Sequence, residues 1–129
     1  MASKSKKITF AAIDIGSNAV RLLIKQLENP ESKVLTKVQL VRVPLRLGFD
    51  VFSKGYISDE KKKDMVRLMK AFRQLMKIYH VDVYRACATS AMRDAANGRE
   101  IIESIYKATG ISIDIIDGKE EAAIIYGNH

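Results

Sequence analysis

Three short stretches of the chain combine residue types that can bind phosphate. In the first, Asp14 lies near the end of an apolar segment. Gly16, Ser17 and Asn18 follow, and a second apolar run occupies residues 20–27, so the pattern predicts two antiparallel strands joined by a tight turn. This turn presents a carboxylate, a hydroxyl and several backbone N–H groups at one sheet edge, a set that suits phosphate with a divalent cation beside it. Because tight turns also favour glycine, serine and asparagine without any ligand, both interpretations stay open from this stretch alone.

The second stretch leaves an apolar run and enters a helix. Thr89 and Ser90 stand at the junction, and Arg93 follows on the first turns. Hydroxyls and free backbone N–H groups at such a junction suit an anion, and a guanidinium can form paired hydrogen bonds to phosphate oxygens. Thr89 or Ser90 equally suits an ordinary helix N-cap, and Asn97 fits a turn position, so neither requires a ligand.

The third stretch opens the last predicted helix with acidic residues. Glu120 and Glu121 follow Gly118 and Lys119. Acidic side chains in the first turn of a helix interact favourably with its dipole, so their position has a structural explanation without any ligand. We expect Lys119 to be exposed.

These stretches, residues 12–21, 88–98 and 116–122, resemble motifs of the exopolyphosphatase and guanosine pentaphosphate phosphohydrolase family (the Ppx/GppA family), in the same order. The resemblance spans nearly all of the chain. It implies an α/β, ribonuclease H-like half-domain of the actin, Hsp70 and sugar-kinase superfamily, with a mixed five-stranded sheet and flanking helices. Members of this family continue into a second lobe, so we expect the chain to be the N-terminal fragment of such an enzyme.

The resemblance also implies roles for individual residues. Asp14 would hold a hydrated Mg²⁺ ion or another divalent cation, and Glu121 would be the general base that activates water. Arg46 resembles a loop residue bordering the cleft, although its flanking residues depart from the commoner pattern. The residues expected to bind phosphate or substrate are Gly16, Ser17, Asn18, Arg21, Thr89, Ser90, Arg93, Asn97 and Gly118. For Arg21, a solvent-facing strand position is an equally good interpretation.

The activity that the resemblance implies is hydrolysis of terminal phosphoanhydride bonds in inorganic polyphosphate or guanosine pentaphosphate. We expect the lone lobe to be a poor catalyst, because a cleft between two lobes needs both walls to exclude water. Two alternatives stay open. One is an ATP-dependent phosphotransferase of the sugar-kinase type, and the other is a non-catalytic sensor that binds polyphosphate or guanosine tetraphosphate.

Hydrophobic periodicity and turn residues predict the elements that position these stretches. After a flexible basic tail (residues 1–7), we expect a single lobe over residues 8–129 in the order βββαβαβα. The predicted strands are 8–15, 20–27, 33–43, 81–88 and 111–116. The predicted helices are 59–79 after an N-cap at Ser58, 99–108 before Gly110, and 119–126, with an irregular connector over 48–55.

The charge and aromatic content of the chain argue against a nucleic-acid-binding protein. The net charge is +7, but aromatic residues are only 7% and no nucleic-acid-binding motif appears, so we expect no nucleic-acid partner. Much of the excess charge follows one predicted helix, which is typical of a solvated face, and positive potential also suits a polyanionic substrate.

No apolar run is long enough for a membrane span. The lone cysteine, Cys87, favours the cytoplasm, and we expect it to be a small buried strand residue. The sequence leaves open whether two copies of the chain form a homodimer.

Overall fold

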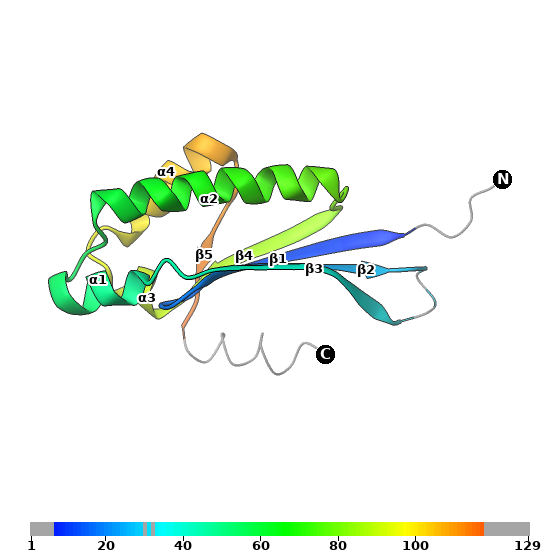
Figure 1. Cartoon of the computed structure of the whole chain (residues 1–129), viewed down its shortest axis with the longest axis horizontal. Coiled ribbons are helices and arrows are strands. Elements are labelled where there is room, and N and C mark those ends of the chain that lie inside the picture. Colours follow the sequence, from blue (N-terminus) through cyan, green and yellow to red (C-terminus); the bar gives the residue numbers. More distant parts are fainter. Residues whose placement is uncertain (1–6, 30, 32, 118–129) are drawn as a thin grey trace.

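The computed structural model describes residues 7–29, 31 and 33–117, and within them five strands form one sheet (Figure 1). The strands are β1 (Ile8–Ile15), β2 (Val20–Leu27), β3 (Leu35–Val43), β4 (Val83–Ala88) and β5 (Asp114–Ile115), arranged as β3-β2-β1-β4-β5. β1 pairs antiparallel with β2, and β2 with β3, whereas β4 lies parallel to both β1 and β5. This arrangement confirms the predicted mixed five-stranded sheet.

Four helices accompany the sheet within the described part of the chain. They are α1 (Leu47–Lys54), α2 (Asp59–Ile78), α3 (Ser90–Asp94) and α4 (Gly98–Thr109). Figure 1 shows α2 and α4 above one face of the sheet, with α1 and α3 at the end where β1 and β4 finish. None of the described helices is both long and apolar enough to cross a membrane.

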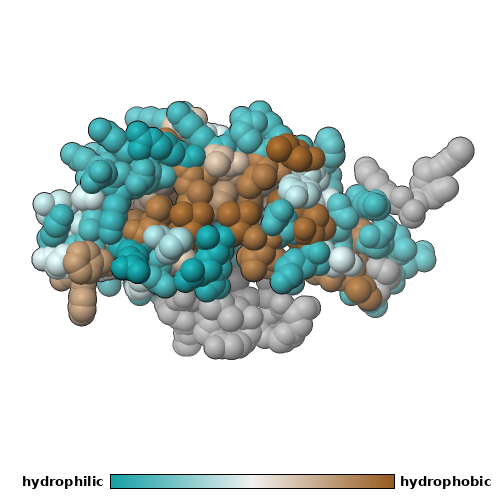
Figure 2. Space-filling model, viewed as in Figure 1, coloured by the Kyte–Doolittle hydropathy of each residue, from teal (hydrophilic) through white to brown (hydrophobic). Residues whose placement is uncertain are grey.

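The core lies between the sheet and the long helix α2. Alternate residues of β1, including Ile13 and Ile15, are buried, as strand geometry requires of a face that is covered by helices. The predicted apolar stripe of α2 is confirmed, since Met65, Met69, Phe72 and Met76 are its buried residues. Figure 2 shows the hydrophilic side chains of α2 at the top of the view and a hydrophobic band beneath them. Cys87 is buried in β4, as expected.

The ends of α2 and α4 follow their sequence signals. The Ser58 hydroxyl accepts a hydrogen bond from the Lys61 N–H at 3.3 Å, which is the predicted N-cap. Gly110 ends α4 with φ 80°, the left-handed backbone that glycine adopts without strain.

Several predicted boundaries were wrong. Residues 48–55 do not form an irregular connector, because α1 occupies Leu47–Lys54; its eight residues and the glycine at position 48 gave only a short periodic signal. The strand predicted over 111–116 is reduced to Asp114–Ile115, and the helix entered after Ala88 is a five-residue α3 that is separate from α4. The described order is therefore βββααβααβ. The helix predicted over 119–126 lies outside the described residues.

Candidate functional site

The turn between β1 and β2 is built from its own backbone and from the start of α1. The Gly16 N–H donates to the Ala19 carbonyl at 3.0 Å and closes the turn. The Arg46 N–H donates to the Asn18 carbonyl at 2.9 Å, and the Gly48 N–H donates to the Ser17 carbonyl at 2.8 Å. These bonds fix the turn against a segment about thirty positions later in the chain.

Gly48 is needed for this close approach. A Cβ atom at position 48 would lie 2.9 Å from the Ser17 Cβ, which is closer than real Cβ contacts. Any larger residue would therefore displace Ser17 or the start of α1.

The first and second predicted stretches meet at the ends of β1 and β4. The Ser17 and Ser90 hydroxyls lie 2.8 Å apart and share a hydrogen bond, although the two residues are 73 positions apart in sequence. The Thr89 N–H donates to the Ile15 carbonyl at 3.1 Å, which extends the parallel pairing of the two strands. Thr89 is the N-cap residue of α3, but its buried side chain makes no capping hydrogen bond. Two hydroxyl-bearing loops thus form one surface.

A cavity of about 710 Å³ opens beside this pair of serines. Arg46 is the basic residue of its lining, Asp94 is the acidic one, and Phe49 and Phe52 supply exposed aromatic rings. The remaining lining residues are Ser17, Asn18, Gly48, Val51, Ser90 and Ala91. The two hydroxyls suit the oxygens of a phosphoryl group, and Arg46 is the basic residue beside them.

Asp14 and Arg21 lie on the sheet face opposite α2 and α4. They are paired across β1 and β2, and Asp14 alternates with the buried Ile13 and Ile15. Both line a depression of about 680 Å³ on this face, together with Lys25 and other residues of the first three strands. Burial raises the pKa of the Asp14 carboxyl, and the Arg21 guanidinium opposes that rise. The structure therefore places Asp14 and Arg21 in a different depression from Ser17 and Ser90.

Arg93 and Asn97 make contacts with backbone groups of the fold. The Arg93 Nη1 donates to the Ile116 carbonyl at 2.7 Å. The Asn97 side chain accepts from the Ile57 N–H at 3.0 Å and donates to the Ile57 carbonyl at 2.8 Å. Neither residue belongs to the lining of the cavity. These bonds hold α3 and α4 against β5 and the start of α2, and a phosphate contact for either residue stays a prediction.

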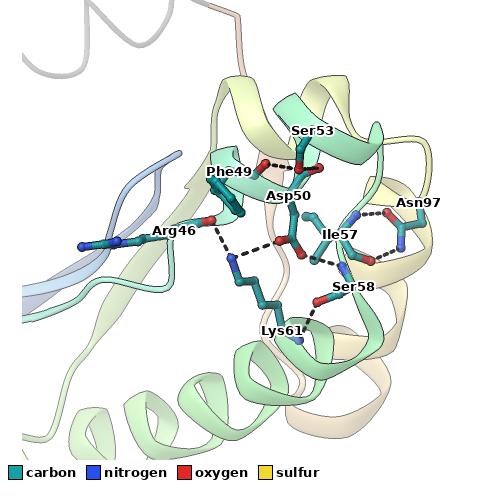
Figure 3. Close-up of polar contacts among 8 residues, drawn as sticks. All are labelled: Arg46, Phe49, Asp50, Ser53, Ile57, Ser58, Lys61 and Asn97. Carbon is teal, nitrogen blue, oxygen red and sulfur yellow. Dashed lines mark hydrogen bonds and ion pairs between the residues drawn. The ribbon is translucent and has the colours of Figure 1, made fainter.

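Sequence reasoning missed a polar network under α1 (Figure 3). Asp50 is buried, and its carboxylate accepts a hydrogen bond from the Ser58 N–H at 2.9 Å. The Lys61 Nζ lies 3.2 Å from the other carboxylate oxygen of Asp50 and donates to the Arg46 carbonyl at 2.9 Å. The only sequence signal was an acidic residue one helical turn from the buried Leu47, a position easily taken for solvent-exposed.

This network sets the charge state of Asp50. Burial would raise the pKa of its carboxyl, but hydrogen bonds from Ser58 and Lys61 and the positive charge of Lys61 outweigh burial and lower the pKa. Asp50 is thus a carboxylate whose acceptor capacity is already used by the fold.

Gly118 and Glu121 lie outside the described residues. Within the described chain, no group of three or more histidine, cysteine, aspartate or glutamate side chains is placed to hold a metal ion. Among the described residues that line the depression on the sheet face, Asp14 is the carboxylate. One carboxylate is compatible with Mg²⁺, which commonly keeps several waters and binds one or two carboxylates together with substrate phosphates.

Solved structures of similar proteins share this fold. The chain matches the structure of a Ppx/GppA family member from Aquifex aeolicus with a TM-score of 0.85 and 26% identity, covering 91% of this chain and 37% of that one. It matches an exopolyphosphatase from Cytophaga hutchinsonii with a TM-score of 0.81 and 28% identity, covering 90% of this chain and 36% of that one. The fold is therefore the ribonuclease H-like fold of actin-like proteins, as expected.

A curated relative and a family model give the same result. A bifunctional 3-dehydroquinate synthase/phosphatase from Fusobacterium nucleatum is 30% identical over 118 residues, which cover 88% of this chain and 18% of that protein. The chain thus spans well under half the length of these relatives. A model of the Ppx/GppA phosphatase family matches residues 25–128. The chain belongs to the Ppx/GppA phosphatase family.

Proposed function

We propose that the complete protein hydrolyses terminal phosphoanhydride bonds in inorganic polyphosphate or guanosine pentaphosphate. The observation that carries this proposal is the contact between Ser17 and Ser90, which joins two hydroxyl-bearing loops at the end of the sheet. Family membership supports a phosphatase.

The cavity beside these serines would hold the phosphoryl group that is to be removed. Ser17 and Ser90 would donate hydrogen bonds from one wall, and Arg46 would supply positive charge from another. Asn18 would add an amide donor from the same turn. A positively charged, hydrogen-bonding wall stabilises the charge that develops on phosphoryl oxygens during transfer.

Asp14 would hold the divalent cation. Its carboxylate is partly desolvated and its pKa is raised, so a nearby cation would favour the ionised form that binds metal. A divalent cation held by Asp14 would supply positive charge to phosphate oxygens of a substrate that reaches this face of the sheet from the cavity. The neighbouring Arg21 and Lys25 would add positive potential on the same face.

The general base would be Glu121. A carboxylate that accepts the proton of water in line with the leaving oxygen is what hydrolysis, as opposed to transfer to an alcohol, requires. Changing Glu121 to Gln in the complete protein should lower kcat by orders of magnitude while polyphosphate still binds. Unchanged turnover would remove Glu121 from this role.

The substrate would be identified by phosphate release from the complete protein with Mg²⁺ and either long-chain polyphosphate or guanosine pentaphosphate. Faster release from polyphosphate identifies an exopolyphosphatase, and faster release from the nucleotide identifies an alarmone phosphatase. ATP consumption only in the presence of a sugar would replace the proposal by a sugar-kinase activity. Binding of either compound without turnover would replace it by a sensor.

The single thiol, Cys87, supports a cytoplasmic location, because reduced cysteines persist in that compartment. Detection of the protein in an exported fraction of its cells would contradict this location.

A further inference from the structure

We infer that Asp50 and Lys61 are positioning residues that hold Arg46 in place for the phosphoryl group. The inference rests on the proposed function, because Arg46 is assigned a role only if the cavity binds phosphate. Figure 3 shows the arrangement: the Arg46 side chain extends away from the network, while its carbonyl faces Lys61.

Arg46 has a backbone conformation that needs support. Its φ of 56° and ψ of 48° lie in the left-handed region, which is unfavourable for a non-glycine residue unless its surroundings stabilise it. Both sides of the residue are held: its N–H donates to the Asn18 carbonyl at 2.9 Å, and its carbonyl accepts from the Lys61 Nζ at 2.9 Å. The left-handed residue also begins α1 and brings Gly48 against Ser17.

Lys61 is itself fixed by the groups around its ammonium. The Nζ atom lies 3.2 Å from the Asp50 carboxylate, 2.9 Å from the Arg46 carbonyl and 5.7 Å from the centre of the Phe49 ring. Only 25% of the Lys61 side chain is exposed, so this ammonium has exchanged part of its hydration for these contacts.

Asp50 provides the carboxylate that pairs with Lys61. Its side chain is only 6% exposed, and its second oxygen accepts the Ser58 N–H at 2.9 Å. The same carboxylate therefore orients Lys61 and fixes the residue that caps α2. A chain of contacts runs from the N-cap of α2 through Asp50 and Lys61 to the backbone of Arg46.

The conformation of Arg46 decides where its guanidinium lies. A residue that leaves the left-handed region rotates its side chain relative to the turn at Ser17 and Asn18. Without Lys61, the Arg46 carbonyl loses a charged donor, and the extended or right-handed conformations become comparatively more favourable. The expected consequence is a weaker hold on phosphate with the rest of the site unchanged.

The chain offers a matched control for Lys61. Lys62 is the next residue on α2, its side chain is 28% exposed, and it pairs with the exposed Glu100 at 3.7 Å, away from Arg46. Lys61→Met and Lys62→Met each remove one ammonium and keep an unbranched side chain that is compatible with a helix.

The test is a double-mutant cycle in the complete protein, measured as the KM for polyphosphate and for guanosine pentaphosphate with saturating Mg²⁺. Arg46→Asn supplies the other side of the cycle, because asparagine tolerates the left-handed region but has no guanidinium. We expect Lys61→Met to raise KM about tenfold and Lys62→Met to leave it within about twofold, in line with the loss of a single charged hydrogen bond. Adding Lys61→Met to Arg46→Asn should then raise KM no further.

The KM values of these variants decide whether Lys61 acts through Arg46. Equal effects of Lys61→Met and Lys62→Met on KM, or additive effects of Lys61→Met and Arg46→Asn, would overturn the inference, because Lys61 would then act on stability or through another residue. Thermal unfolding of each variant separates a loss of folded protein from a loss of affinity. Absence of turnover in the unsubstituted protein with both substrates would instead reject the proposed function. Direct binding of polyphosphate to the same variants would in that case decide whether Lys61 acts through Arg46.

Discussion

Two carboxylates near the candidate site have opposite surroundings. Asp14 lies on the sheet face opposite α2 and α4, where Arg21 is its cross-strand partner and burial raises the pKa of its carboxyl. Asp50 lies in α1, where Ser58 and Lys61 occupy both of its oxygens and lower the pKa of its carboxyl. One carboxylate is destabilised in its ionised form and suited to bind a cation, whereas the other is satisfied by the protein itself.

The difference shows that the ability of an acidic residue to bind a ligand depends on the groups that already bond to it, and not on its proximity to the site. Both residues are within a few positions of a segment that lines the cavity. A buried carboxylate with its hydrogen bonds complete has little left to offer a ligand. A carboxylate whose ionised form is disfavoured gains from an added positive charge.

The largest expected effect comes from Asp14→Asn. This change removes the charge that would hold the divalent cation and keeps the size of the side chain. We expect kcat/KM for phosphate release at low Mg²⁺ to fall on the order of 100-fold, with partial recovery when Mg²⁺ is raised. A loss that Mg²⁺ cannot reduce at any concentration would contradict a role for Asp14 in metal binding.

A smaller effect is expected from Ser17→Ala. The change removes the hydroxyl that contacts Ser90 at 2.8 Å and would donate to phosphate. We expect KM for the substrate to rise about tenfold, consistent with the loss of one hydrogen bond to a charged group, while the Mg²⁺ requirement stays unchanged.

Ser53→Ala is the control for Ser17→Ala. The Ser53 hydroxyl donates to the Phe49 carbonyl within α1 at 2.7 Å and is not part of the cavity lining. If both alanine variants raise KM equally, the effect belongs to α1 and its surroundings and not to the contact between the two serines.

The smallest expected effect is on the free energy of unfolding as a function of pH, and it has opposite signs for the two carboxylates. Because the folded pKa of Asp50 is lowered from 3.8, its ionised form adds stability at neutral pH, and that stability is lost as pH falls through the folded pKa. Because the folded pKa of Asp14 is raised from 3.8, its ionisation reduces stability as pH rises from 3.8 through the folded pKa.

Urea unfolding in metal-free buffer measures both effects. At neutral pH, Asp50→Asn should lower the free energy of unfolding, and the difference from the unsubstituted protein should shrink below pH 3.8. Asp14→Asn should raise the free energy of unfolding at neutral pH, and this gain should likewise shrink toward pH 3.8. If both substitutions change the free energy of unfolding with the same sign, the two carboxylates do not differ in this way.

The sequence predicted the parts of the fold that have strong periodicity or local signals. The strands 8–15 and 20–27 were predicted with their observed bounds, and the α2 stripe and its Ser58 cap were correct. The helix α1 was missed, because eight residues give too short a pattern and its stability comes from burying Leu47 and bonding Asp50 to a later segment.

The site was predictable to the extent that it depends on motifs. The turn at Ser17 and the junction at Ser90 were both identified, but their direct contact depends on the parallel pairing of β1 and β4, a long-range feature. The separation of Asp14 from the cavity follows from strand alternation, which the sequence pattern already contained. The left-handed backbone of Arg46 and its support by Lys61 had no sequence signal, because arginine rarely adopts that conformation.

The different roles of Asp14 and Asp50 are tested by phosphate release from the complete protein as a function of Mg²⁺ concentration, compared between Asp14→Asn and Asp50→Asn. If Asp14 binds the cation, Asp14→Asn should raise the half-saturating Mg²⁺ concentration by on the order of 100-fold. Asp50→Asn should leave that concentration unchanged and raise only the KM for the phosphate substrate. Equal shifts of the Mg²⁺ requirement in both variants, or no shift in Asp14→Asn, would show that Asp14 does not bind the cation.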